Sequence, residues 1–565
     1  MHFIHLQMQK EMKFFVKICV LILLSCHVQS KKLWWETMSL YQVYPRSFMD
    51  SDGDGIGDLK GIESRLSHLV DSHVDAFWLS PIYKSPMVDY GYDASSFTEI
   101  DKIFGTNADF ESLVREAHKL SLKVIMDFVP NHSSDQHEWF QKSVKGIEPY
   151  TDYYVWHKGH KINNTIKEPN NWRSVFGGSA WTWNEQRQAF YLHQFGFTQP
   201  DLNYRNEKLS EEMKNVLRFW MDRGVDGFRI DATPYIFEDE RFLDEPLSGI
   251  SDVNDYSYTI SIYTKDQPKN YELMSEWRKV VDDYSAKVDQ VPRVLMVEAY
   301  ANNSMTMKYY TSGIHFPFNF ILMDIKNSST AQDIKNFVDK WMLTMPQGAT
   351  ANWVTGNHDN PRLVSRLGFH RAIAVTTMAL LLPGISVTYN GEEIGMVDTP
   401  INTTDPSRFR DPVRSPFQWD NSTSAGFSTN PKTWLPVNKN YKTLNLEFQK
   451  ATKESYYNYY RELATFRKTS SIRNGNLELK VLDNDILAFA RKAKGKNSVY
   501  VVINLNNQTK TINLRKFKNT PGQITIYKAT PGVDIQSNGL VKSDAAKIPP
   551  NATVIFIGKN KKNRH

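Results

Sequence analysis

Cysteine is nearly absent from this chain of 565 residues, which holds two, Cys19 and Cys26. Both lie within the first thirty residues, so removal of that segment would leave a protein without any thiol. Such a protein has no disulfide framework, no cysteine nucleophile and no cysteine-ligated metal. A chain of this length can bury a core large enough to fold without disulfides.

A long apolar run is also missing near the N-terminus. The stretch around Ile18–Ser25 is shorter than the roughly twenty residues that a membrane helix needs. Lysines precede it at three positions, and Val28-Gln29-Ser30 offers small residues for cleavage. This pattern is typical of a secretory signal over residues 1–30, so we expect a secreted protein without a membrane span. An uncleaved anchor is the alternative.

The body of the chain has no excess of charge of either sign. The net charge is +6, of which the first thirty residues contribute +2 and residues 559–565, a basic tail, contribute +4. The remainder is therefore neutral, and no basic surface for nucleic acid is implied. The sequence also has no internal repeat and no low-complexity stretch.

What the sequence does contain is an alternation of strand-like and helix-like segments from about residue 39 to 395. This alternation is typical of βα units, and eight candidate strands are enough to close a (β/α)8 TIM barrel. A helix is expected over Asp109–Leu120. The candidate strands are Leu40–Pro45, Ala76–Pro81, Val124–Val129, Gly227–Ile230, Val294–Val297, Phe318–Met323, Trp353–Thr355 and Ile385–Tyr389.

Two regions depart from this alternation of strands and helices. Residues 133–203 are rich in Trp, Tyr, Asn and Gly and are too long for a plain βα loop, which indicates a small domain inserted after the third strand. Residues 478–558 alternate as in antiparallel strands and predict a C-terminal β domain. The barrel is then expected to comprise residues 31–132 and 204–477.

Four short segments place reactive side chains at strand ends. They are Asp127–His132, Gly227–Ala232, Val297–Ala299 and Asn357–Asp359. In a parallel barrel, residues just past the strand C-termini all face one mouth. Carboxylates there, with imidazoles and a guanidinium, suit cleavage of a glycosidic bond, in which one carboxylate attacks and one carboxylic acid protonates the leaving oxygen.

In this order and spacing the four segments closely resemble the α-amylase family of retaining glycoside hydrolases. The resemblance implies that Asp231 is the nucleophile, Glu298 the general acid and base, and Asp359 the third acid that holds the sugar distorted. It further implies that Arg229 and the buried Asp127 orient the nucleophile, and that His132 and His358 bind sugar hydroxyls. No cofactor is expected for catalysis.

Further segments narrow the resemblance to the oligo-1,6-glucosidase and α-glucosidase branch, most similar to secreted insect maltases. Gln199–Asn203 resembles the marker of that branch. Asp89 matches a residue that binds the terminal glucose, and Tyr92 matches one that stacks on it. Arg410 and Arg414 match two arginines that close the pocket. The resemblance implies an exo-acting α-glucosidase that cleaves maltose, short malto-oligosaccharides and sucrose, and Ala232 after the nucleophile implies a preference for α-1,4 bonds.

Other functions share parts of this pattern. A catalytically silent relative, such as an amino-acid transporter heavy chain or a surface receptor, usually lacks members of the acid set, which is present here. A transglycosylase or sucrose isomerase would share every catalytic residue, so product analysis and not sequence separates it from a hydrolase.

An acidic loop follows the first strand. Its oxygen donors at alternating positions, with glycines between them, suit a hard cation such as Ca²⁺, with Mg²⁺ as the alternative. Gly61 stands where an EF-hand has its closing glutamate, so this loop is of a different type. The predicted ligands are Asp50, Asp52, Asp54, the Ile56 carbonyl and Asp58.

Sequons for N-glycosylation occur throughout the chain and agree with secretion. One begins at Asn131, inside a catalytic segment, and is expected to be buried and unmodified. The predicted glycosylation sites are Asn163, Asn302, Asn327, Asn402, Asn421, Asn507 and Asn551.

Overall fold

A computed structural model describes residues 32–404, 408–535 and 537–559. The chain divides into two compact units, residues 1–36 and 37–565, and the second unit is described below. The predicted signal over residues 1–30, with both cysteines, lies outside the described residues, as does the basic tail after Lys559. Within the described part of the chain, no helix is both long and apolar enough to cross a membrane.

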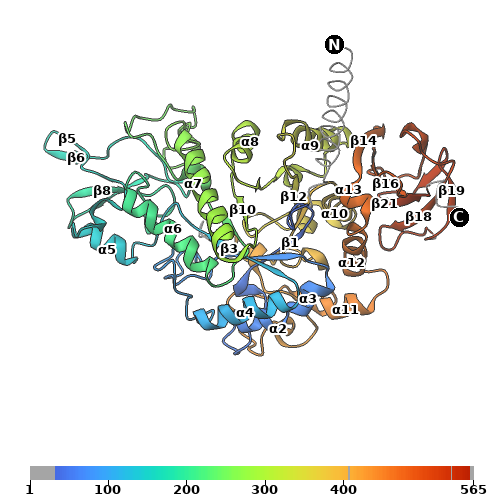
Figure 1. The fold of residues 1–565 in the computed structure, drawn as a ribbon, viewed down its shortest axis with the longest axis horizontal. Helices are drawn as coiled ribbons and strands as arrows, with labels where there is room; N and C mark the ends of the chain where they lie inside the picture. The colour runs from blue at the N-terminus through green and yellow to red at the C-terminus, as the bar shows by residue number, and fades with distance from the viewer. Residues whose placement is uncertain (1–31, 405–407, 536, 560–565) are drawn as a thin grey trace, which may run out of the picture. The chain divides into compact units, whose positions relative to one another are not determined.

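Eight parallel strands form the central sheet (Figure 1). Their spatial order is β11-β10-β9-β3-β2-β1-β13-β12, and every recorded pair of neighbours is parallel. The barrel prediction is therefore confirmed. The strands are β1 (Ser39–Val43), β2 (Ala76–Leu79), β3 (Lys123–Phe128), β9 (Gly227–Ile230), β10 (Val294–Val297), β11 (Phe316–Pro317), β12 (Asn352–Val354) and β13 (Ile385–Tyr389).

The prediction of the sixth strand over Phe318–Met323 is wrong. The strand is the short β11 before it, and Ile321–Asp324 form a 3-10 helix whose Leu322 is fully buried. The apolar run covers the residues after the strand and the following helical turn. Because apolar residues predominate in both, apolar periodicity alone does not separate them.

Two buried asparagines close the ring between β11 and β12. The Asn319 backbone N–H donates to the Asn352 side-chain oxygen at 2.8 Å, and the Asn352 amide nitrogen donates to the Pro317 carbonyl at 2.7 Å. The Val354 N–H donates to the Asn319 carbonyl at 3.2 Å. The side-chain amide of Asn352 thus binds two backbone groups that the short β11 and the residues after it would otherwise leave unpaired in the core.

Helices surround this sheet and connect its strands (Figure 1). The helix predicted over Asp109–Leu120 is α4 (Asn107–Lys119), and it begins earlier because Thr106 and Asp109 form a capping box. The others in the barrel region are α2 (Leu59–Ser64), α3 (Leu66–Asp71), α6 (Glu207–Met221), α7 (Pro268–Tyr284), α8 (Asn303–Thr311), α9 (Ala331–Thr344), α10 (Leu363–Leu381), α11 (Leu446–Ala451), α12 (Tyr456–Arg467) and α13 (Ser470–Asn474).

The segment between β3 and α6 contains small antiparallel elements. After α5 (Glu138–Val144), a three-stranded sheet has the order β4-β8-β7 and a hairpin pairs β5 with β6. Its buried tryptophans Trp172 and Trp181 stack at 5.8 Å. The strands are β4 (Trp156–His157), β5 (His160–Ile162), β6 (Thr165–Lys167), β7 (Trp181–Asn184) and β8 (Ala189–Leu192).

An antiparallel sheet begins at Asn476 and has the order β14-β15-β16-β21-β18-β19, beside a β17-β20 pair. It shares one buried apolar cluster with α9, α10 and α12, which includes Trp341, Leu463 and Phe489. The strands are β14 (Asn476–Asp483), β15 (Ile486–Lys492), β16 (Ser498–Asn504), β17 (Lys510–Ile512), β18 (Gln523–Ala529), β19 (Leu540–Lys542), β20 (Ala546–Ile548) and β21 (Thr553–Gly558).

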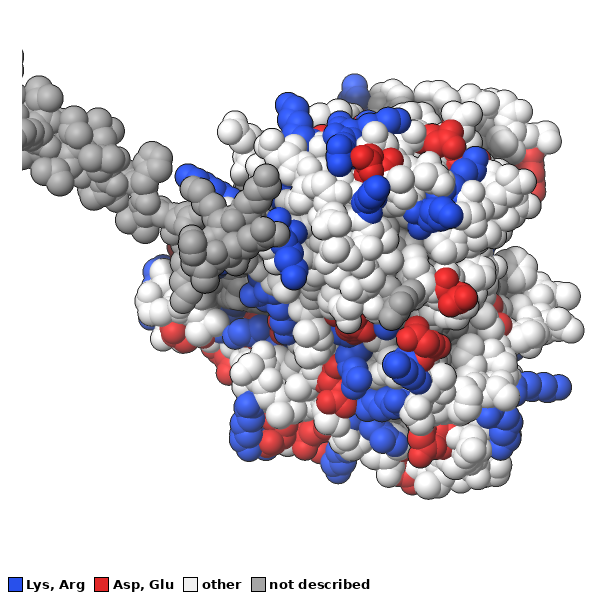
Figure 2. Space-filling view, turned by 90° about the vertical axis from the view of Figure 1, so that its right-hand side faces the viewer, with Lys and Arg blue, Asp and Glu red and all other residues white. Residues whose placement is uncertain are grey.

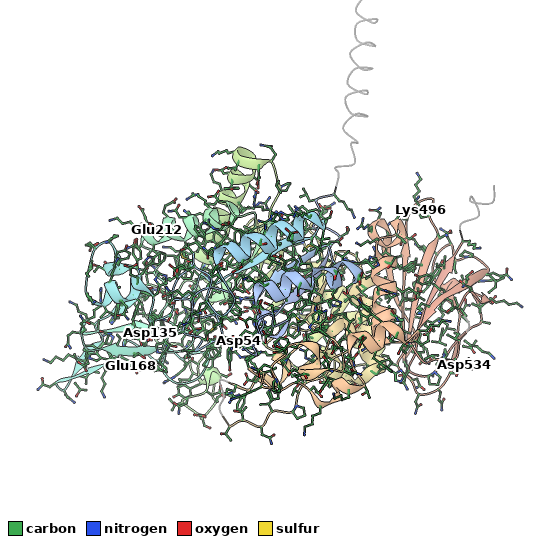
Figure 3. All side chains as sticks on the ribbon, turned by 90° about the horizontal axis from the view of Figure 1, so that it is seen from below. Asp54, Asp135, Glu168, Glu212, Lys496 and Asp534 are labelled. Carbon is green, nitrogen blue, oxygen red and sulfur yellow. The ribbon has the colours of Figure 1, made fainter. Side chains whose placement is uncertain are left out.

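The barrel lies between these two regions. In Figure 3, Asp135 and Glu168 mark the inserted segment at one end, and Lys496 and Asp534 mark the C-terminal sheet at the other. On the face shown in Figure 2, basic and acidic side chains are interspersed.

Candidate active site

The candidate catalytic residues come together at the C-terminal ends of the parallel strands. Asp231 directly follows β9, Glu298 directly follows β10, and Asp359 lies in the loop after β12. The register of β3 and β9 places Asp127 opposite Arg229. Because the strands are parallel, their ends meet at one mouth, as the sequence predicts.

Arg229 joins three of these carboxyl groups. Arg229 is 1% exposed, and its guanidinium contacts Asp127 at 2.9 Å and Glu298 at 2.8 Å and also donates to Asp231. Trp78 donates its indole N–H to Asp127 at 3.1 Å. The carboxylates raise the pKa of Arg229 well above its usual value despite burial, so the guanidinium stays charged and holds them in fixed positions.

Burial separates the pKa values of Asp231 and Glu298. Desolvation raises the pKa of Glu298 to about 8 against the opposing charge of Arg229, and the nearby Asp231 carboxylate adds to the rise. Desolvation also raises the pKa of Asp231, to about 6, with Arg229 again opposing. Near pH 7 Glu298 is therefore mostly protonated and Asp231 mostly ionised, the division of protons that a general acid and a nucleophile require.

Asp359 belongs to a second charged network. Arg410 contacts it at 3.0 Å and Arg414 at 2.8 Å, and Arg410 also binds Asp89 at 2.7 Å. Burial favours a higher pKa for Asp359, but His358 and the two arginines outweigh it and hold the pKa below its usual value. Asp359 is thus an anion fixed between two cations, and the network extends across the pocket to Asp89.

The histidines of the site are buried and neutral. Burial lowers the pKa of His132 to about 4 and that of His358 to about 3. The ring of Tyr92 lies parallel to that of His358, and its hydroxyl lies 2.8 Å from the His358 Nε2. Gln199, from the branch marker, donates to Asp89 at 3.2 Å, which connects that marker with the pocket.

These groups surround a cavity of about 330 Å³. The predicted residues that line it are Asp89, Tyr92, His132, Asp231, Ala232, Glu298, His358, Asp359 and Arg410, and Asp127, Arg229 and Arg414 support them through the contacts above. The lining residues that the sequence analysis did not single out are Val175, Phe176, Phe195, Pro234, Tyr235, Tyr300 and Asn360. Most of these residues belong to loops. Their sequence signal was the presence of aromatic side chains, which are common in sugar-binding pockets.

A comparison with protein families matches residues 42–475 to the α-amylase catalytic domain. The chain belongs to the α-amylase family. It is 48% identical over 543 residues to an α-glucosidase of Apis mellifera, with 93% of this chain and 94% of that protein covered. It is 48% identical over 505 residues to a salivary α-glucosidase of Anopheles gambiae, with 85% of each chain covered.

The catalytic-domain match and these relatives identify this α-amylase family member as a glycoside hydrolase. A solved structure of an α-glucosyl transfer enzyme is also similar, with a TM-score of 0.81, 31% identity, and 94% of this chain and 100% of that chain covered. One relative has another role: an amino acid transporter heavy chain of Mus musculus is 38% identical over 549 residues, covering 93% of this chain and 80% of that protein.

Ala232 has an unusual backbone conformation. Its φ of 48° and ψ of 30° lie in the left-handed region, which side chains with a Cβ adopt at a cost. Its N–H donates to the Glu298 Oε2 at 3.3 Å, and its side chain lines the cavity. The residue after Asp231 therefore contacts Glu298 through its backbone and borders the cavity with its side chain.

The acidic loop lies outside the cavity lining. The carboxylates of Asp50, Asp52 and Asp58 converge, with one oxygen of each within 4.8 Å of the others, whereas Asp54 is not one of this group. Asp50 also accepts from the Gly53 and Gly55 backbone N–H groups at 2.7 and 2.8 Å. Backbone donors thus hold Asp50 in place, and three carboxylates from one loop are a donor set that fits a hard cation.

The asparagines that begin the sequons differ in their exposure to solvent. Asn131 is 1% exposed and donates to Asp201 at 3.2 Å. The seven predicted glycosylation sites, Asn163, Asn302, Asn327, Asn402, Asn421, Asn507 and Asn551, are all exposed.

Proposed function

We propose that this family member is an exo-acting α-glucosidase, a maltase that removes terminal α-1,4-linked glucose from maltose, short malto-oligosaccharides and sucrose. The observation that carries the proposal is the pair Asp231 and Glu298, bound to one arginine in one cavity with pKa values of about 6 and about 8. The named insect relatives support the substrate class.

The proposed reaction retains the anomeric configuration in two displacements. Asp231 attacks the anomeric carbon and forms a glucosyl ester, while Glu298 transfers its proton to the departing glycosidic oxygen. Glu298, now a carboxylate, takes a proton from water, whose oxygen displaces Asp231 and releases α-glucose. Arg229 stabilises both carboxylates as the charge moves between them.

The charged network on the far side of the cavity supports the exo mode. Arg410 bridges Asp89 and Asp359, and Arg414 binds Asp359. In the proposed mode these charged side chains would block a sugar chain that continued beyond the terminal glucose. Asp89, Asp359, His132 and His358 then offer the polar atoms that would bind the hydroxyls of one terminal glucose.

A transglycosylase is the second candidate, because the similar α-glucosyl transfer enzyme has 31% identity to this chain. Transfer differs from hydrolysis in which hydroxyl attacks the glucosyl ester. A catalytically silent relative, such as the transporter heavy chain, does not require two carboxyl groups with different pKa values. The difference between the pKa values of Asp231 and Glu298 therefore favours an enzyme.

Further parts of the proposal concern the rest of the chain. We propose secretion, supported by the salivary relative and by the exposed sequons. The acidic loop would hold a structural Ca²⁺, or Mg²⁺, through Asp50, Asp52 and Asp58, apart from the reaction. Residues 133–203 and the region from 478 would be domains accompanying the barrel.

Substrate tests on purified protein decide between these functions. Maltose, sucrose, isomaltose, trehalose and starch are offered, and products are separated by chromatography while proton NMR follows the first anomer released. Hydrolysis of maltose with α-glucose first is expected; early β-glucose would overturn retention, and dominant transfer products would favour the second candidate. Asp231→Asn and Glu298→Gln should each lose several orders of magnitude in kcat, whereas exposed Glu168→Gln should not.

A further inference from the structure

A second hollow of about 420 Å³ adjoins the catalytic cavity. The two share Tyr300 and Asn360. Tyr300 is 42% exposed and stacks on Phe320 at 4.6 Å, so an aromatic pair lies where the hollows meet. The loop after β10 supplies Tyr300 and leads directly from Glu298 into α8.

The position of this hollow relates it to the leaving part of the substrate, an assignment that rests on the proposed function. The Asp89–Arg410–Asp359 network closes the glucose side of the catalytic cavity. Glu298 protonates the departing oxygen, and the hollow adjoins the loop that follows Glu298. A sugar chain beyond the cleaved bond therefore extends toward the second hollow.

Asn302 lines this hollow and begins a sequon, Asn302-Asn303-Ser304. It is the exposed N-cap of α8: its Oδ1 accepts from the Met305 N–H at 3.1 Å and from the Ser304 hydroxyl at 2.8 Å. Both bonds use the oxygen, which leaves available the amide nitrogen, the atom to which an N-linked glycan is attached. The cap therefore holds the side chain in one orientation without occupying its attachment atom.

Asn327 provides a contrast. Its amide nitrogen donates to the Arg366 carbonyl at 3.2 Å, and it does not line either hollow. Among the predicted glycosylation sites, Asn302 thus combines an available amide nitrogen with a place at the second hollow.

We propose that an N-linked glycan on Asn302 covers the second hollow and limits the length of the leaving sugar chain. A disaccharide places one sugar beyond the cleaved bond and stays clear of the glycan. A longer oligosaccharide must pass under it. Glycosylation at this cap would make the enzyme favour maltose over malto-oligosaccharides.

Two substitutions remove the sequon while keeping the Asn302 cap. Ser304→Ala removes the hydroxyl that glycosylation requires, and Asn303→Pro blocks the sequon at the first position of α8, where proline is well tolerated. Asn302 has φ −65° and ψ 159°, an extended conformation that suits the residue before a proline. Ser304→Thr keeps the sequon and is the matched control.

The full-length secreted protein from a eukaryotic host is tested by glycopeptide mass spectrometry and by kinetics with maltose and maltoheptaose. We expect an occupied Asn302, and a maltoheptaose-to-maltose ratio of kcat/KM that rises about threefold or more in both variants lacking the sequon but not in Ser304→Thr. Enzymatic removal of glycans from the wild type should produce the same rise.

An unmodified Asn302, or an unchanged ratio in an enzyme that cleaves maltose, would overturn the role of the glycan and leave the proposed function intact. A lack of maltose hydrolysis in every form, including Ser304→Thr, would overturn the proposed function and the glycan's role together.

Discussion

Replacing Ala232 with valine tests how the residue after the nucleophile selects the linkage. Ala232 is 5% exposed, has φ 48° and lines the cavity beside Asp231. A residue with a Cβ in this left-handed conformation already costs about 1–2 kcal/mol, and a β-branched side chain is less compatible with it. The variant is therefore expected to lose stability as well as room in the pocket.

The selectivity effect comes from the two added methyl groups. They would crowd a 1,4-linked leaving sugar more than a 1,6-linked one, whose extra methylene moves the ring away. Discrimination by groups of this size is worth roughly 1–3 kcal/mol, so Ala232→Val should shift the maltose-to-isomaltose ratio of kcat/KM toward isomaltose by about tenfold or more. Wild type should cleave maltose well, isomaltose poorly and long starch slowly.

Ala232→Gly separates strain from crowding. Glycine adopts positive φ readily and adds no side chain, so its melting temperature should equal or exceed that of wild type and its ratio should not move toward isomaltose. Initial rates with both disaccharides and thermal melts of the three proteins complete the test. If wild type prefers isomaltose, or the valine variant keeps the wild-type ratio, Ala232 does not select the linkage.

Three further predictions concern the protonation of Asp231 and Glu298, the contacts of Arg414 and the acidic loop. The profile of kcat/KM against pH should fall below about 6 as Asp231 is protonated and above about 8 as Glu298 ionises, and a Glu298→Gln variant that keeps the alkaline fall would contradict this assignment. Arg414→Lys removes the hydrogen bond to the His358 carbonyl and weakens the contact with Asp359. KM for maltose should therefore rise about tenfold, the size of effect expected for hydrogen bonds to charged groups. An unchanged KM would show that Arg414 does not position Asp359 for substrate binding. Excess chelator should lower the melting temperature while initial activity persists, whereas an unmoved melting curve without metal on elemental analysis would exclude a bound cation.

Local pattern predicted most of the barrel because most of its strands are short buried runs with polar residues or glycine near at least one end. Gly227–Ile230 and Val294–Val297 are strands with the predicted bounds, and Asp231 and Glu298 follow them directly. The prediction failed at the sixth strand, where apart from Asn319 the residues from the strand through the helical turn to Met323 are apolar, so the sequence does not mark where the strand ends. The closing bonds of Asn319 and Asn352 also had no local signal.

The sequence by itself determined which chemical groups stand at the strand ends, because side-chain identity and a parallel-strand pattern suffice to send them to one mouth. The tertiary structure decided what those groups can do. Burial raises the pKa of Glu298 above that of Asp231, and loops distant in sequence bring Arg410 onto Asp89 and place Tyr300 between two hollows. Desolvation and contacts between distant segments exist only once the chain is folded, so no local pattern encodes them.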